Sequence, residues 1–110
     1  MSCFPSRFPL ALITVVTWLA GASPVLAAAP TRPAKLGQCV GCHGDTGLSR
    51  VAGTPRLAGQ DETYLVNALM AYRSGSRDHA LMASIANTLQ PRDIAALALW
   101  YSRQKGFVQP

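Results

Sequence analysis

The stretch Cys39-Val40-Gly41-Cys42-His43 determines the fold that we predict for this chain. Two cysteines separated by two residues and followed at once by histidine are typical of a c-type haem attachment site. Each thiol can add to one haem vinyl group and form a thioether, and the imidazole can then reach the iron from one face. We therefore predict one covalent haem c, attached through Cys39 and Cys42, with His43 as a ligand of the iron.

An apolar segment precedes the motif. Residues 1–7 carry one positive charge, and residues 10–20 are uncharged and largely apolar. Val25 with Ala27, and Ala27 with Ala29, supply small residues at the −3 and −1 positions of two cleavage points, after Ala27 or after Ala29. This layout predicts a secretory signal peptide over residues 1–27 and a mature domain over residues 28–110, exported to the periplasm with no membrane span. The alternative is a retained anchor, because residues 10–29 contain no charge and are nearly long enough to span a bilayer.

The mature domain is small for a hydrophobic core of its own. The chain has 110 residues, and loss of Arg7 with the leader lowers its formal net charge from +5 to +4. Cys3 leaves too, so the remaining cysteines are those of the motif, and a disulfide between them would close only a tiny loop. A domain of about 80 residues has a marginal core. A large, flat, apolar haem would supply the missing centre.

Apolar spacing predicts helices and no strands. We expect a helix over residues 34–42 that ends in the motif, a glycine-rich loop over 44–60 and a helix over 61–73. A single helical turn at 83–87 and a last helix from Pro91 to about residue 105 follow, with Arg103 and Lys105 near its end. The fold class is thus all-α, with three to five short helices around one haem. The last helix should bury Ile94, Leu97, Ala98 and Tyr101.

The sixth position of the iron decides between two kinds of function. An open position would bind gases or peroxide, whereas a second strong ligand suits electron transfer. The candidates are Met70, His79 and Met82. Met70 lies inside a helix and is expected to fill the core, and His79 lies in a polar loop. Met82 stands where that loop becomes apolar, so we predict that a flexible stretch carries its thioether across the haem. His/Met ligation raises the reduction potential.

Two further features bear on the site. The Pro55 carbonyl could accept the Nδ1–H of His43 and fix the orientation of the ring, or Pro55 could simply form a rigid turn.

Arginines in the surrounding region could steer an acidic redox partner, pair with a haem propionate, or form an ordinary solvated face. They are Arg50, Arg56, Arg73, Arg77 and Arg92. Trp100, Tyr101, Tyr64 and Tyr72 are expected to pack rather than to relay electrons.

Five segments in order resemble a small monohaem class I bacterial cytochrome c, of the kind also found duplicated in dihaem periplasmic cytochromes. They are Cys39-Val-Gly-Cys42-His43-Gly44, Pro55-Arg-Leu-Ala-Gly-Gln60, Tyr72-Arg73-Ser-Gly75-Ser-Arg77, Met82-Ala-Ser-Ile-Ala86, and Asp93-Ile-Ala-Ala-Leu97 with Trp100-Tyr101. The resemblance implies His43 and Met82 as axial ligands and the Pro55 carbonyl as partner of His43. It also implies terminal helices that cross near the motif, with Leu97 and Tyr101 against the first helix.

The sequence therefore predicts a single-electron carrier rather than an enzyme, acting as a monomer between redox partner proteins. It could also be a haem-containing subunit of a dehydrogenase. A haem sensor or peroxidase with an open sixth position is the alternative, and a thiol–disulfide or zinc protein is a third hypothesis. Nucleic-acid binding has no support, because no run of basic residues is interleaved with aromatic ones.

Overall fold

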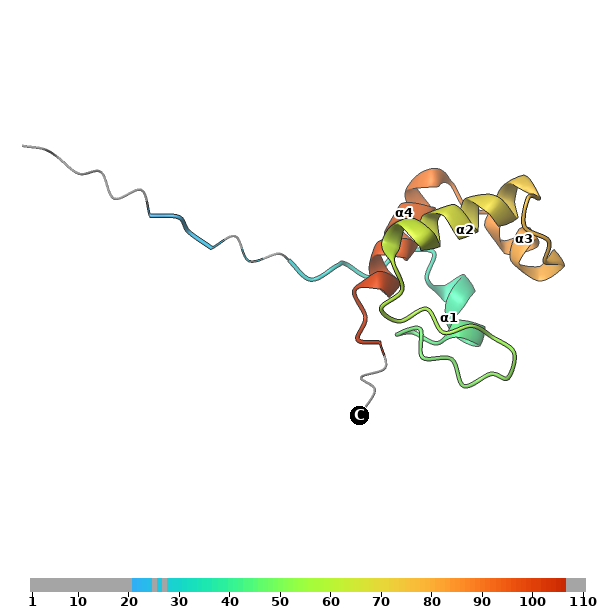
Figure 1. Ribbon diagram of the computed structural model, residues 1–110, viewed down its shortest axis with the longest axis horizontal. Coiled ribbons are helices and arrows are strands. Elements are labelled where there is room, and N and C mark those ends of the chain that lie inside the picture. The colour runs from blue at the N-terminus through green and yellow to red at the C-terminus, as the bar shows by residue number, and fades with distance from the viewer. Residues whose placement is uncertain (1–20, 25, 27, 107–110) are drawn as a thin grey trace, which may run out of the picture.

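The computed structural model describes residues 21–24, 26 and 28–106, so most of the predicted signal peptide lies outside the described residues. Four helices follow one another: α1 (Gly37–His43), α2 (Glu62–Ser74), α3 (Ala80–Asn87) and α4 (Pro91–Ser102). The described residues contain no strand. The predicted all-α class is confirmed, and Figure 1 shows α2 and α4 side by side, with α3 next to α2.

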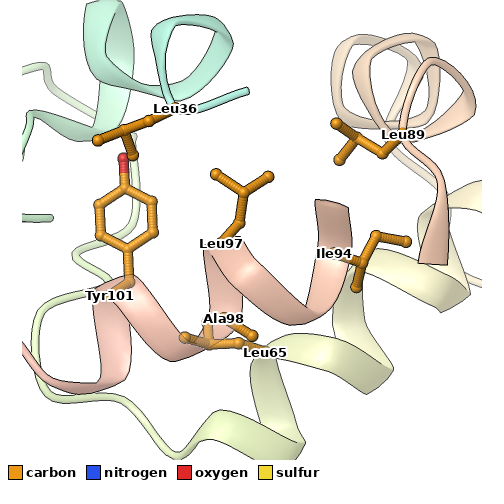
Figure 2. Packing of buried hydrophobic residues seen from close by; sticks show 7 residues of the cluster. All are labelled: Leu36, Leu65, Leu89, Ile94, Leu97, Ala98 and Tyr101. Atoms are coloured by element: carbon orange, nitrogen blue, oxygen red, sulfur yellow. The ribbon is translucent and has the colours of Figure 1, made fainter. Parts of the chain in front are cut away.

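The first helix is shorter than predicted. It begins at Gly37 rather than at residue 34, because the preceding residues form a tight turn in which the Leu36 N–H donates to the Pro33 carbonyl at 3.1 Å. Leu36 is fully buried against α4, close to Leu97 and Tyr101 (Figure 2). The last helix thus packs against the beginning of the motif helix.

The second helix has a defined end at each side. The Asp61 carboxylate accepts the backbone N–H of Tyr64 at 2.7 Å and caps the N-terminus. Gly75 ends the helix in the left-handed conformation, with φ +80°. Leu65 is buried in the core cluster shared with α4. These ends lie within one residue of the predicted ones.

The third helix corrects the prediction of a single turn at residues 83–87. It begins at Ala80, because Nδ1 of His79 accepts the backbone N–H of Met82 at 3.2 Å and so caps the helix. Alanine, leucine and methionine at the next three positions all favour helix. Met82 therefore lies in the first turn of a helix and not in a flexible loop.

The fourth helix carries most of the core. Pro91 occupies its first turn, and the Asp93 carboxylate accepts the Gln90 N–H at 2.9 Å. The helix ends at Ser102, earlier than predicted, so Arg103 and Lys105 lie beyond it. Its four predicted core residues are all buried, and Figure 2 shows them with their neighbours. The core cluster is Leu36, Leu65, Leu89, Ile94, Leu97, Ala98 and Tyr101.

Candidate functional site

A cavity of about 400 Å³ lies among residues of α1, the following loop, α2 and α3. Its lining includes every site residue predicted from the sequence, namely Cys39, Cys42, His43, Pro55 and Met82. Leucine and isoleucine side chains form much of the rest, among them Leu57, Leu65, Leu69 and Ile85. Sites for cofactors are typically apolar cavities of this size with a few polar groups.

The motif helix presents its three reactive side chains on one face. Cys39, Cys42 and His43 have the i, i+3 and i+4 spacing that places side chains together on a helix. His43 is 9% exposed, and its Nδ1 lies 2.7 Å from the carbonyl oxygen of Pro55. A carbonyl can only accept, so Nδ1 donates its hydrogen, and Nε2 is left with the lone pair that can bind a metal.

The loop after α1 is attached to the motif through Ser49, a residue that the sequence analysis missed. Ser49 is 8% exposed, and its hydroxyl donates to the Cys42 carbonyl at 2.6 Å. The same oxygen accepts the Val51 N–H at 3.1 Å. A serine in a glycine-rich loop has no sequence signal that distinguishes a buried brace from an exposed turn.

Gly47 lies close against the segment that follows Pro55. Its carbonyl accepts the N–H groups of Leu57 at 2.9 Å and of Ala58 at 3.3 Å. A Cβ at this position would lie 2.5 Å from the Ala58 nitrogen and 2.9 Å from Cδ1 of Tyr101. Leu57 and Ala58 follow Pro55 closely, so this contact also determines where the Pro55 carbonyl lies relative to His43.

Two aromatic residues of α4 hold the residues that follow His43. The Tyr101 hydroxyl donates to the Gly44 carbonyl at 2.9 Å, and Nε1 of Trp100 donates to the Asp45 carbonyl at 2.8 Å. Burial raises the pKa of Tyr101 above its usual range. The expectation that both residues pack is confirmed, because Tyr101 is 2% exposed in the core cluster and Trp100 packs against that cluster. Their hydrogen bonds add an anchoring role.

The three candidates for the sixth ligand are separated by the fold. Met82 and His79 line the cavity, whereas Met70 does not and is 41% exposed. The prediction that Met70 fills the core is wrong, because the inward face of α2 is taken by Leu65 and Leu69, and the next residue points about 100° away. His79 lies edge-on to Tyr72, with 6.2 Å between ring centroids.

Two of the five arginines line the cavity, Arg56 and Arg77. The guanidinium of Arg77 lies 4.7 Å from the ring centroid of Tyr72. The interaction with Tyr64 raises the pKa of Arg77. Arg50, Arg73 and Arg92 are not part of the lining, so fewer of the predicted arginines lie at the cavity than the sequence suggested.

These residues fit the haem c that the motif predicts. Two thiols, an imidazole with a free Nε2 and a thioether meet in one apolar cavity, which is the donor set of a covalently attached, His/Met-ligated haem. Within the described part of the chain, no helix is both long enough and apolar enough to cross a bilayer.

Comparison with known proteins supports the same class. No protein-family model matches the chain. It is 43% identical to cytochrome c-554(548) of Halomonas halodenitrificans, over 64% of this chain and 89% of that protein. It is 39% identical to the thiosulfate dehydrogenase electron acceptor of Thiomonas intermedia over 96% of its own length, but it spans only about half (48%) of that protein. The cytochrome c4 of Pseudomonas aeruginosa is 35% identical over 66% of this chain and 36% of its own length.

Proposed function

The chain belongs to the class I c-type cytochromes, electron carriers with covalently bound haem c, and on that premise we propose that it carries single electrons through one haem in the periplasm. The observation that carries the proposal is that both motif cysteines, His43 and Met82 line one cavity. Bound haem supplies a one-electron iron couple. Cys39 and Cys42 would hold the haem through two thioethers, and His43 and Met82 would ligate the iron.

The surroundings of His43 support its role as a permanent ligand. The Pro55 carbonyl holds Nδ1 at 2.7 Å, so the ring keeps one tautomer and one orientation. Two further contacts support the His43–Pro55 hydrogen bond. The Ser49 hydroxyl binds the Cys42 carbonyl of the motif, and the Gly47 carbonyl accepts N–H groups of the two residues that follow Arg56. A ligand that keeps its geometry in both oxidation states lowers the reorganisation that accompanies electron transfer.

The position of Met82 supports ligation from a fixed helix end. Its backbone N–H donates to His79, which orders the first turn of α3. A thioether is a soft ligand that favours the ferrous state, so Met82 would give the protein a raised reduction potential. His79 is less suited to the iron, because its Nδ1 accepts the Met82 N–H, so the neutral ring carries its hydrogen on Nε2 and has no free lone pair for a metal.

We further propose that the partners are exported redox proteins with acidic docking faces. Cys42 is exposed at the cavity, so a haem attached to it would present its edge to a docked partner. The Thiomonas relative is named as the acceptor of thiosulfate dehydrogenase, and a dehydrogenase of this kind is the donor we propose, with this chain as a separate carrier or as a subunit of the complex. The working form is residues 28–110, monomeric, with residues 1–27 removed on export.

A thiol–disulfide function is disfavoured by the site itself. Burial raises the pKa of the Cys39 thiol to about 11, whereas reactive redox thiols need a pKa near or below neutrality. A zinc site would need further ligands, and among the described residues no group of three His, Cys, Asp or Glu side chains is placed so that it could hold a metal ion.

Two measurements test the proposal. A pyridine haemochrome spectrum of protein made with the haem attachment machinery should report one haem c per chain. Met82→Ala should then give a high-spin iron that binds carbon monoxide readily, while the matched control Met70→Ala, an exposed methionine outside the cavity, should keep the low-spin spectrum. An unchanged low-spin Met82→Ala protein would assign the ligand to His79 instead. Rapid carbon monoxide binding by the unaltered ferrous protein would favour a sensor or peroxidase.

A further inference from the structure

Arg77 lies at the cavity together with Tyr64 and Tyr72. Its guanidinium lies 4.7 Å from the ring centroid of Tyr72, and its interaction with Tyr64 raises the pKa of Arg77. Its backbone N–H donates to the Ala71 carbonyl at 3.1 Å, which fixes the chain just after the end of α2. All three side chains belong to the cavity lining. Arg77 is itself exposed, so these contacts restrict a side chain that would otherwise lose conformational entropy when it is ordered.

The charge of Arg77 is not neutralised by a carboxylate of the protein. Among the residues that the structure describes, no ion pair includes Arg77. Asp78 follows Arg77 directly but does not pair with it. A guanidinium offers a planar fork of donors that matches a carboxylate, and an oriented fork loses little freedom on binding. Arg77 is therefore prepared for an anion that the chain does not supply.

We propose that Arg77 binds a haem propionate, with Tyr64 and Tyr72 as positioning residues that hold its guanidinium. The inference rests on the proposed function, because the haem brings the carboxylate. A haem propionate fits better than an acidic side chain of a partner protein, since Arg77 and both tyrosines line the same cavity as Cys39, Cys42 and His43. Arg73, one turn earlier on α2, has the same charge but is not part of that lining.

The proposal predicts a specific effect on the iron. Oxidation adds one positive charge to the haem, and a guanidinium fixed nearby opposes it. Loss of Arg77 should therefore stabilise the oxidised form and lower the reduction potential. The carboxylate stretching bands of the propionate should shift as well, because the bidentate hydrogen bonds are lost.

The test compares three variants of the haem-loaded protein: Arg77→Gln, Arg77→Lys and the matched control Arg73→Gln. Each is first shown by pyridine haemochrome to contain haem, which separates a failure of this proposal from a failure of the proposed function. Redox titration and redox-induced infrared difference spectra are then recorded at one pH and ionic strength. Arg77→Gln should shift the propionate bands and lower the potential. Arg77→Lys should restore most of the potential but not the bands, because an ammonium cannot form the fork. Arg73→Gln should leave the bands unchanged.

Identical infrared spectra for Arg77→Gln and Arg73→Gln would overturn the assignment. So would an Arg77→Gln protein whose bands are unchanged but whose electron transfer with a partner protein is slower, since Arg77 would then bind the partner's carboxylate. If Arg77→Gln does not fold, Arg77→Lys keeps the charge and still tests the fork through the propionate bands.

Discussion

Alanine at Gly47 should destabilise the protein far more than alanine at Gly53 in the same loop. Both glycines have left-handed backbones, with φ +80° and +75°, so both substitutions incur a strain of about 1–2 kcal/mol. Only Gly47 is enclosed: its Cβ would lie 2.5 Å from the Ala58 nitrogen and 2.9 Å from Cδ1 of Tyr101, whereas a Cβ at Gly53 would meet nothing within 4 Å. The difference between the two variants thus isolates the close contact.

The additional cost at Gly47 follows from what must move. The nearest atom belongs to the backbone, so rotation of a side chain cannot relieve the overlap, and overpacking of this kind costs about 1–3 kcal/mol. We therefore expect Gly47→Ala to lose about 2–5 kcal/mol and Gly53→Ala about 1–2 kcal/mol. Displacement of Leu57 and Ala58 should also move the Pro55 carbonyl away from Nδ1 of His43, which would change the reduction potential in the first variant alone.

Guanidinium denaturation of both haem-loaded variants, followed by circular dichroism, measures the free energies of unfolding, and redox titration measures the potentials. Equal losses of stability in the two variants would refute the steric argument. A large loss of stability for Gly47→Ala without any change of potential would refute the link from Gly47 through Pro55 to His43.

Three further predictions concern the same region. Tyr101→Phe removes the donor to the Gly44 carbonyl and should cost about 1 kcal/mol at pH 7. Because burial raises the pKa of Tyr101, the unfolded state releases the phenol proton at a lower pH than the folded state does. The parent protein should therefore lose stability as pH rises above about 10, and Tyr101→Phe should lose less. Equal losses of the free energy of unfolding between about pH 7 and about pH 11 in the two proteins would contradict this account. Ser49→Ala removes the hydroxyl that joins Cys42 to Val51 and should cost about 1–3 kcal/mol in the same assay. Replacing Cys39 and Cys42 with alanine prevents haem attachment and should leave the chain largely unfolded; a cooperative thermal transition in that variant would be evidence against a haem-dependent core.

Local patterns were enough for the parts of the fold that depend on neighbouring residues. The spacing of Cys39, Cys42 and His43 predicts both the haem and the helical turn that presents it, since covalent chemistry and helix geometry are short-range. The apolar period of α4 predicts its buried face, confirmed from Ile94 to Tyr101. The same reasoning failed for the start of α3, because a histidine N-cap is rarer than the usual serine, threonine or aspartate. It also failed for Met70, because the apolar character of a residue does not show which face of the helix is buried.

Tertiary structure decided how the site is braced and where its charges lie. Ser49 and Gly47 became important only when the loop folded back on the motif, and Tyr101 reaches Gly44 across 57 positions of the chain. Of the five arginines that the sequence offered equally, the fold places Arg56 and Arg77 at the cavity, and Arg77 lies over the ring of Tyr72. Such contacts join segments that are distant in sequence, and they depend on how the helices pack, which no local pattern encodes. The motif alone is sufficient to attach a haem and supply one ligand, whereas packing determines how firmly His43 is held and whether Met82 can complete the iron site.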